Sequence, residues 1–262
     1  LQVANGMAVL QDDLDRLSSW MDRNYLALNA KKTQFITFAG KEILKKLPVH
    51  LNINLLGQSI SRSSCVKNLG VQMDETLQFD KHIDQVVRSS TRAAFAIRSA
   101  VKSLPLSTVE ELVRSLIFPI FDYCNVVFMS APHAQLDRLR KAENLAVRLC
   151  YGRRKYDSAS DIFTANDWLR YNQRAQKQQL SMMHRCLFGP APPYLTRMIE
   201  FSLGSARNGD NVPLRPPRVR QEVGRRRFAY SGSVAWNNLP NGLKLLSHGS
   251  FCGSIKEVLA AE

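Results

Sequence analysis

Apolar positions near the start of the chain recur every three or four residues. The series comprises Met7, Leu10, Leu14, Leu17 and Met21, with Trp20 beside it. This spacing places apolar side chains on one face of an α-helix. We therefore predict an amphipathic helix over residues 7–27, with Asp12, Asp13 and Asp15 mostly on its solvent side.

Short segments with the character of β-strands follow this helix. Residues 33–38 (TQFITF) are β-branched and aromatic, residues 50–55 (HLNINL) alternate between apolar and polar, and residues 65–73 (CVKNLGVQM) are similar. A turn at residues 56–58 separates the second segment from the short SIS sequence. The pattern predicts a small antiparallel sheet after one helix.

After Phe79 the apolar positions return to the helical period. The first stripe consists of Ile83, Val86, Val87, Ser90, Ala94, Ile97, Val101 and Leu104. We expect Asp80 to cap this helix. The capping-box sequence of residues 107–110 (STVE) should open the next helix, and Pro119 should interrupt it.

The helical period continues through residues 133–150 and 171–188, each followed closely by glycine. From residue 201 the chain becomes rich in Gly, Asn, Pro and Arg, which predicts irregular structure. Residues 228–240 (FAYSGSVAWNNLP) form either a strand or a short helix within it.

These patterns predict a mainly α, α+β fold. A small antiparallel sheet is followed by a helical bundle and a basic irregular tail. The predicted divisions are residues 1–78, 79–200 and 201–262.

Composition supports a folded, soluble protein, because 45% of the 262 residues are hydrophobic. No uninterrupted apolar run approaches the roughly 20 residues of a membrane helix, and the first ten residues lack a charged signal-peptide start. We therefore expect no membrane partner. The chain begins with Leu and enters a helical pattern almost at once, so we interpret it as part of a longer product.

The cysteines predict no metal site. All five are single, without a CxxC pair or a histidine at zinc-ligand spacing. We expect buried thiols in a reducing compartment, the cytoplasm or the nucleus. The sequence also lacks a phosphate-binding GxxxxGKS loop, an HExxH motif and a nucleophile elbow.

The formal net charge of +14 favours polyanionic partners, of which nucleic acid is the commonest. The excess is concentrated in residues 207–227, with seven arginines and two acids. A solvated basic surface is the alternative explanation.

Two motifs carry a resemblance to a known family. Residues 28–33 (LNAKKT) and residues 69–83 (LGVQMDETLQFDKHI) resemble motifs D and E of reverse transcriptases from jockey-like, non-LTR retrotransposons. Residues 149–157 (LCYGRRKYD) and 224–240 (GRRRFAYSGSVAWNNLP) are similar to segments of the family's C-terminal region. The resemblance implies a palm edge, a helical thumb and a post-thumb tail.

The same resemblance places the catalytic aspartates outside this chain. In the family, an aspartate hairpin that precedes the motif D helix holds the catalytic Mg²⁺ ions. Asp12 and Asp13 lie within a helical period, so we interpret them as a solvated helix face. We expect no catalytic residue and no cofactor in this chain.

Lys32 matches the lysine of motif D, which the resemblance places near the incoming triphosphate. An ammonium there neutralises developing phosphate charge or donates a proton. An ordinary lysine at a helix end is the alternative.

Leu69, Gly70 and Val71 match motif E, the primer grip, where backbone approaches the primer's sugar-phosphate. Gly70 suits such an approach because it has no side chain. A purely structural turn or bulge glycine is the alternative.

The helix after motif E corresponds to the start of the thumb. A helical projection places Lys81, Arg88, Arg92 and Lys102 opposite the apolar stripe, with Phe95 among them. Such a face suits phosphate contact along a duplex, although a solvated face is the commoner origin of such a stripe.

Two further basic segments are candidates for nucleic-acid binding. Arg153, Arg154 and Lys155 lie between two tyrosines, an arrangement that suits a single strand but also a plain surface loop. Arg225, Arg226 and Arg227 precede Tyr230 and Trp236, and the resemblance implies RNA or target-DNA contact there.

We therefore predict part of an RNA-directed DNA polymerase that grips the template–primer duplex. Its partners would be RNA, DNA and the remaining palm and fingers of the same polypeptide. The alternative is a non-enzymatic nucleic-acid-binding protein derived from a decayed or co-opted retroelement.

Overall fold

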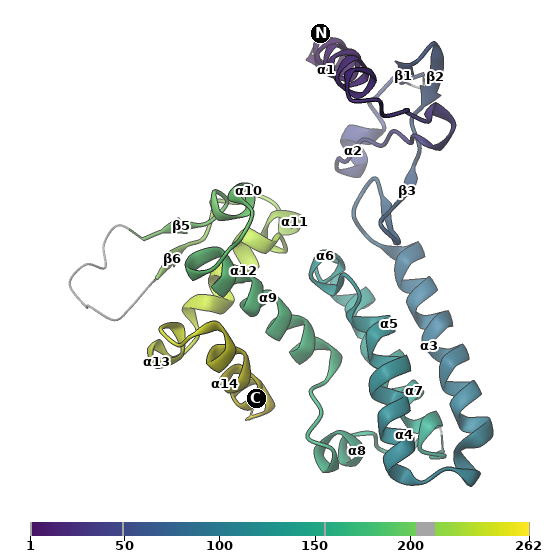
Figure 1. Ribbon diagram of the computed structural model, residues 1–262, viewed down its shortest axis with the longest axis vertical. Helices are drawn as coiled ribbons and strands as arrows, with labels where there is room; N and C mark the ends of the chain where they lie inside the picture. The colour runs from purple at the N-terminus through teal and green to yellow at the C-terminus, as the bar shows by residue number, and fades with distance from the viewer. Residues whose placement is uncertain (1, 49, 155, 203–212, 262) are drawn as a thin grey trace. The chain divides into compact units, whose positions relative to one another are not determined.

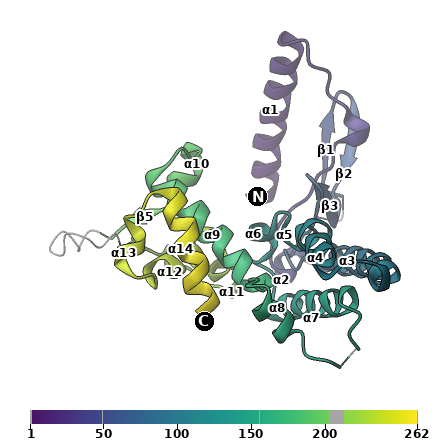
Figure 2. The ribbon, with the colours of Figure 1, turned by 60° about the horizontal axis from the view of Figure 1, so that its bottom comes forward.

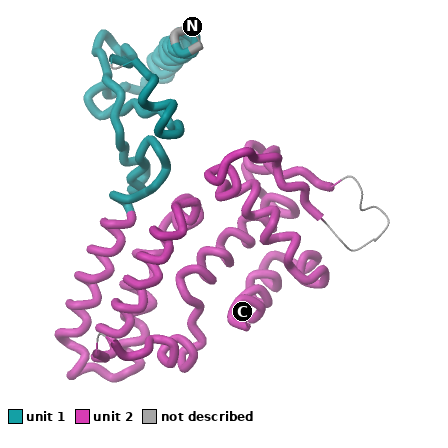
Figure 3. Tube along the Cα trace, turned by 180° about the vertical axis from the view of Figure 1, so that it is seen from behind, with its two compact units in different colours: residues 1–82 teal, residues 83–262 magenta. Residues whose placement is uncertain are grey.

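The computed structural model describes residues 2–48, 50–154, 156–202 and 213–261. The chain divides into two compact units, residues 1–82 and 83–262 (Figure 3). In the described residues, α-helices predominate, and the strands form two-stranded antiparallel sheets. The predicted mainly α, α+β fold class is confirmed.

The first unit contains one long helix and two β-hairpins (Figure 1). Its elements are α1 (Gln2–Arg23), η1 (Ala30–Lys32), α2 (Lys41–Leu44), β1 (Asn52–Leu55), β2 (Gln58–Ser61), β3 (Cys65–Asn68) and β4 (Val71–Asp74). β1 pairs with β2, and β3 pairs with β4. The long first helix is confirmed, although it runs over Gln2–Arg23 rather than over residues 7–27.

Part of the predicted apolar stripe of α1 packs against a small core of Phe35, Leu51 and Ile53. The residues in contact are Met7, Leu10 and Leu14, whereas Leu17 is exposed. The amide of Gln11 also reaches the β1 backbone: Nε2 donates to the carbonyl of Asn54 at 2.8 Å, and Oε1 accepts from its N–H at 2.9 Å. The Gln11 amide therefore satisfies the backbone groups of Asn54 as a neighbouring strand would.

Two strand predictions were wrong. Residues 33–38 do not form a strand of a sheet. Among the described residues, their backbone pairs with another segment only at an isolated bridge between Phe35 and Arg62. Residues 65–73 are not one strand but the β3–β4 hairpin. A two-residue turn with positive φ at Leu69 and Gly70 reverses the chain between these strands.

The second unit is mainly helical, and its first helix, α3 (Asp80–Ala100), begins in the last residues of the first unit. Ile83, Ser90 and Ala94 on its predicted stripe are fully buried. Asp80 lies in the first helical turn rather than before it. Its role as the cap stays a prediction, and the residue before the helix, Phe79, has a positive φ.

An irregular helical segment follows α3. It comprises η2 (Val101–Ser103), α4 (Leu106–Leu112), the π-helical turn η3 (Val113–Ile117), α5 (Phe118–Asp122) and α6 (Asn125–Phe128). The predicted capping box does not form, because α4 already begins after Pro105 and Ser107 is inside it. The predicted interruption at Pro119 is confirmed: this residue lacks an N–H, and the helix changes from π to α there.

Two helices coincide with their predicted ranges. They are α7 (His133–Cys150) and α9 (Tyr171–Phe188), separated by α8 (Ser160–Ala165). Gly152 ends α7 with φ of +65°, and the N–H of Arg153 donates to the carbonyl of Arg148 at 2.9 Å. This is the glycine-dependent helix end that the sequence predicts.

The C-terminal region folds against α9 (Figures 1 and 2). Its described elements are α10 (Pro193–Thr196), β5 (Glu200–Phe201), β6 (Leu214–Arg215), α11 (Glu222–Arg225), α12 (Phe228–Asn237), α13 (Asn241–Lys244) and α14 (His248–Ala261). Trp236, Phe251 and Ile255 share one core with Leu180 and Met183 of α9. The expected irregular tail is therefore largely helical in its described part, because its aromatic and aliphatic residues bury against α9.

Among the helices of the described residues, none has the length and apolarity needed to cross a membrane. No three His, Cys, Asp or Glu side chains of these residues gather in a way that would hold a metal ion.

Candidate nucleic-acid interface

The β3–β4 turn brings together the three residues predicted for the primer grip. Leu69 and Gly70 have φ angles of 45° and 88°, and Val71 begins β4. The Leu69 side chain is 82% exposed, whereas Val71 is 4% exposed. Gly70 accommodates the positive φ without the strain of a side chain. The hairpin tip therefore presents backbone and Leu69 outward, while Val71 is part of the core.

Asp74 fixes the chain that leaves this hairpin. Its carboxylate accepts hydrogen bonds from the N–H groups of Thr76, Gln78 and Phe79 at 3.0, 3.0 and 2.6 Å, and from Oγ1 of Thr76 at 2.7 Å. Burial raises the pKa of Asp74, but these hydrogen bonds together outweigh burial and lower it. The ionised carboxylate thus binds donors of the segment between β4 and α3.

Lys32 lies exposed on the short helix η1. Asn29 caps this turn, since its Oδ1 accepts from the N–H of Lys32 at 3.2 Å. The hydroxyl of Thr33 donates to the carbonyl of Asn29 at 2.9 Å. The local sequence therefore holds the lysine backbone in place and leaves its ammonium in solvent.

The predicted basic residues along α3 are all exposed: Lys81 in its first turn, Arg88 and Arg92 in its middle, and Lys102 just beyond its end. We call Arg88, Arg92 and Lys102 the α3 basic face. Phe95 lies among them with 56% of its surface exposed. The ring of Phe95 is therefore accessible from solvent beside these cations.

Asp84 partly occupies the start of this face. It forms an ion pair with Arg138 of α7 and approaches Arg88 at 3.9 Å. Within the described part of the chain, Arg92 makes no ion pair. Arg92 is therefore more available than Arg88 to bind an external anion.

Phe95 also borders a small groove between α3 and the end of α7. The groove has a volume of about 490 Å³, and we call it the Phe95 groove. It is lined by Phe95, Arg98, Leu145, Arg148, Leu149, Arg153 and Arg154. The structure thus joins two candidate segments, the α3 aromatic and the arginines after α7, that the sequence left separate.

The arginines of this groove contact Asp157 and Asp161 through backbone and side-chain groups. Arg153 pairs with Asp161 at 3.1 Å, and the carbonyl of Asp157 accepts from Nη1 of Arg148 at 3.0 Å. Asp157 also accepts from the backbone N–H of Arg154 at 2.7 Å, and the Arg154 side chain is exposed. Lys155, the third predicted residue of this segment, lies outside the described residues.

Sequence reasoning missed Arg98. It lies three residues after Phe95, so the two side chains share one side of α3. That spacing was the available signal, but only the packing of α7 against α3 makes Arg98 part of a groove.

The last basic segment is less open than its sequence suggests. Arg225 and Arg227 are exposed, whereas the Nε and Nη1 atoms of Arg226 are buried. Trp236, which follows them, is fully buried in the core on α9. This tryptophan is not available for stacking on a base.

Comparisons with known proteins agree with the resemblance carried by the motifs. The chain is 25% identical over 156 residues to the RNA-directed DNA polymerase from mobile element jockey of Drosophila melanogaster. It is 23% identical over 146 residues to the probable RNA-directed DNA polymerase from transposon X-element of the same species. These matches cover 58% and 55% of this chain but only 16% of each relative.

No protein-family model matches the chain, and no solved structure matches it significantly. The similarity to non-LTR retrotransposon polymerases predicted from the sequence is confirmed by the two relatives.

Proposed function

We propose that this chain, which is similar to RNA-directed DNA polymerases of mobile elements, is a part of such a polymerase that holds the template–primer duplex. The observation that carries this proposal is the meeting of the α3 basic face with the Phe95 groove in the second unit. Cations on one helix face contact successive phosphates without reading sequence.

The proposal assigns different tasks to the two parts of this surface. Arg92 and Lys102 on the α3 basic face supply charge to duplex phosphates. Phe95 offers a ring against which a terminal or unpaired base stacks, beside the guanidinium groups of Arg98 and Arg154.

The hairpin tip and Lys32 have roles that follow from the resemblance. The backbone at Leu69 and Gly70 would approach the primer, and Lys32 would lie near the incoming triphosphate. The carboxylates that bind Mg²⁺ would belong to another part of the polymerase, together with the remaining palm and fingers.

The surface of α1 is compatible with such neighbours. Leu17 and Trp20 are about half exposed on this helix, and neither belongs to the small core of the first unit. The proposal assigns these two side chains to contact with the rest of the palm.

Binding of a labelled, primed RNA–DNA hybrid, followed by fluorescence anisotropy at increasing KCl, tests the proposal. We expect affinity to fall steeply with salt. The double variant Arg88→Glu/Arg92→Glu should weaken binding about tenfold or more, and the salt slope should decrease by about 1 for each phosphate that the variant no longer neutralises. The isolated chain should extend no primer in the presence of Mg²⁺.

Arg140→Glu/Lys141→Glu on α7 is the matched control, with the same change in net charge. Hydrogen bonds from Lys141 and Arg140 lower the pKa of Asp137 to about 2, so these cations already have a partner. Equal decreases in affinity for both double variants would reduce the effect to net charge and contradict the proposal. Primer extension by the pure chain would contradict the placement of the catalytic carboxylates.

A further inference from the structure

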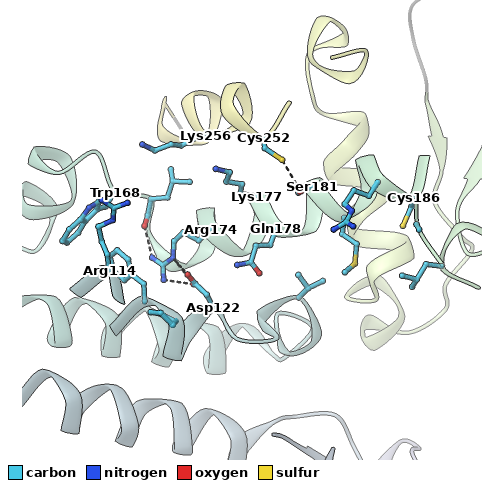
Figure 4. A pocket seen from close by; sticks show the side chains of 18 of the residues that line it. Arg114, Asp122, Trp168, Arg174, Lys177, Gln178, Ser181, Cys186, Cys252 and Lys256 are labelled. Atoms are coloured by element: carbon cyan, nitrogen blue, oxygen red, sulfur yellow. Dashed lines mark hydrogen bonds and ion pairs between the residues drawn. The ribbon is translucent and has the colours of Figure 1, made fainter. Parts of the chain in front are cut away.

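A larger pocket lies along α9 (Figure 4), and none of the predicted nucleic-acid-binding residues lines it. Its volume is about 900 Å³, near the upper end of the range for ligand sites. We call it the α9 pocket. Residues of α5, α9 and α14 line it, and the segment after α8 contributes Trp168.

A buried ion-pair network fixes the floor of the pocket. Arg174 of α9 donates from Nη1 to Glu143 of α7 at 2.7 Å, and from Nε to both carboxylate oxygens of Asp122 at 2.9 Å. The Glu143 side chain is fully buried, and its other oxygen accepts from the N–H of Tyr171 at 2.8 Å. Removing one member would leave a buried charge unpaired, so this network is a rigid support rather than a ligand site.

Other cations at the pocket remain open to a ligand. Arg114, Lys177 and Arg185 line it, and none of them forms an ion pair with an acid among the residues that the structure describes. Lys256 also lines it but is paired with Asp167. The pocket therefore has an excess of unpaired positive charge beside a fixed wall.

The positions of Lys177 and Arg185 indicate how many anionic groups a ligand needs. Both are on α9, eight residues apart, which corresponds to about 12 Å along the helix axis. A single phosphate does not contact two side chains separated in this way without drawing them together. A ligand that satisfies both cations carries several anionic groups in a chain.

Trp168 gives the pocket an aromatic end. The positive φ of Asp167, 51°, turns the chain after α8, and the N–H of Trp168 donates to the carbonyl of Phe163 at 2.9 Å. The indole meets the ring of Phe118 edge-to-face at a centroid distance of 5.1 Å. Trp168 is thus held in place, only partly buried, beside the open cations.

We propose that the α9 pocket binds a single-stranded segment of nucleic acid, with phosphates on Lys177, Arg185 and Arg114 and a base against Trp168. This inference rests on the proposed function, and it adds a second site for the unpaired strand next to a duplex. A repeating anionic backbone with flat rings satisfies both features of the pocket. An acidic peptide satisfies only its charge.

The test compares two double variants on two probes. The variants are Lys177→Glu/Arg185→Glu in the pocket and Arg88→Glu/Arg92→Glu on the α3 basic face, which change net charge equally. The probes are a fluorescein-labelled single-stranded oligodeoxynucleotide of about twelve nucleotides and the primed hybrid. Poly-glutamate serves as the competing acidic peptide, and circular dichroism verifies folding of each variant.

We expect the pocket variant to lose about tenfold or more in single-strand affinity and little in hybrid affinity, with the reverse for the α3 variant. Trp168→Leu should weaken single-strand binding about tenfold, because it removes the stacking surface but keeps an apolar side chain. Unchanged single-strand affinity in the pocket variant would overturn the inference, whatever happens to the hybrid. Efficient competition by poly-glutamate together with no effect of Trp168→Leu would assign the pocket to an acidic peptide instead.

Cys252 provides a measurement that needs no variant. It lines the pocket, and its Sγ lies 3.3 Å from Oγ of Ser181. The bound oligodeoxynucleotide should protect Cys252 from iodoacetamide, while the comparably exposed Cys124 should react as before. Mass spectrometry of the peptides distinguishes the two thiols, and equal alkylation of Cys252 with and without saturating oligonucleotide would count against the pocket.

Discussion

The Phe95 groove and the segment from Gly224 to Pro240 share a composition but use it differently. Both place arginines close to aromatic residues. In the groove the ring of Phe95 is 56% exposed beside Arg98, whereas Trp236 of the second segment is fully buried on α9. Arginine–aromatic sequences thus indicate stacking only where the fold leaves the ring in solvent. In the second segment the aromatic residues hold the fold together.

Trp236→Ala should have the largest effect on stability in this comparison. A buried tryptophan reduced to alanine typically costs about 3–5 kcal/mol, and here it removes the centre of the core shared with Phe251. Urea unfolding followed by circular dichroism measures the decrease in stability. Trp20→Ala, at a side chain that is 51% exposed, is the matched control and should cost much less. Similar decreases for both would deny the structural role of Trp236.

Gly232→Ala should have the next largest effect. A Cβ at this position of α12 would lie 2.9 Å from Sδ of Met183, a residue that is itself fully buried. We expect a destabilisation of about 1–3 kcal/mol from overpacking, measured by the same unfolding experiment. Gly253→Ala on α14, where nothing lies within 4 Å, should instead stabilise by up to about 1 kcal/mol. Stabilisation by Gly232→Ala would show that α12 does not pack against α9 this closely.

Acidification should weaken the Trp236 core and leave the groove unchanged. Burial lowers the pKa of His184, and the neighbouring His248 lowers it further. The hydrogen bond that Nε2 of His184 donates to the carbonyl of Leu246 raises this pKa and opposes both effects. The unfolded chain then binds more protons below about pH 6.5, so the stability contributed by neutral His184 is present above that pH and lost below it. Guanidinium groups do not titrate there.

Melting temperatures at about pH 7.5 and about pH 5.5, compared between the wild type and His184→Gln, test this point. The variant should show the smaller decrease. An identical decrease would assign the effect to other groups, such as the buried His82, whose pKa burial also lowers.

Phe95→Ala should have the smallest effect on stability, within about 0.5 kcal/mol, because its ring is largely exposed. Hybrid affinity should nevertheless fall about tenfold if the ring stacks on a base. Leu106→Ala, at an equally exposed apolar residue of the same unit, is the control and should leave affinity unchanged. Unchanged hybrid affinity in Phe95→Ala would show that the groove binds nucleic acid through its charges and not through stacking on this ring.

The sequence predictions were most accurate where the interactions involved join residues close together in the sequence. The limits of α7 and α9 were predicted correctly, because helical periodicity and a following glycine act within a few residues. The apolar–polar pattern of residues 65–73 predicted one strand where the chain reverses at Leu69 and Gly70, since a single glycine in such a pattern is compatible with a bulge or with a reversal. The capping box at residues 107–110 failed because the helix already begins at Leu106, directly after Pro105.

By itself, the sequence determined the amphipathic helices, the mainly helical fold class and the resemblance carried by residues 28–33 and 69–83, since these depend on local spacing. Only the tertiary structure decided which charged and aromatic residues lie together. It brought Arg153 and Arg154 to Phe95, buried Trp236, and arranged Trp168, Lys177 and Arg185 around one pocket. The physical reason is that exposure and proximity depend on packing between elements distant in sequence, whereas helical periodicity depends on neighbours within one or two turns.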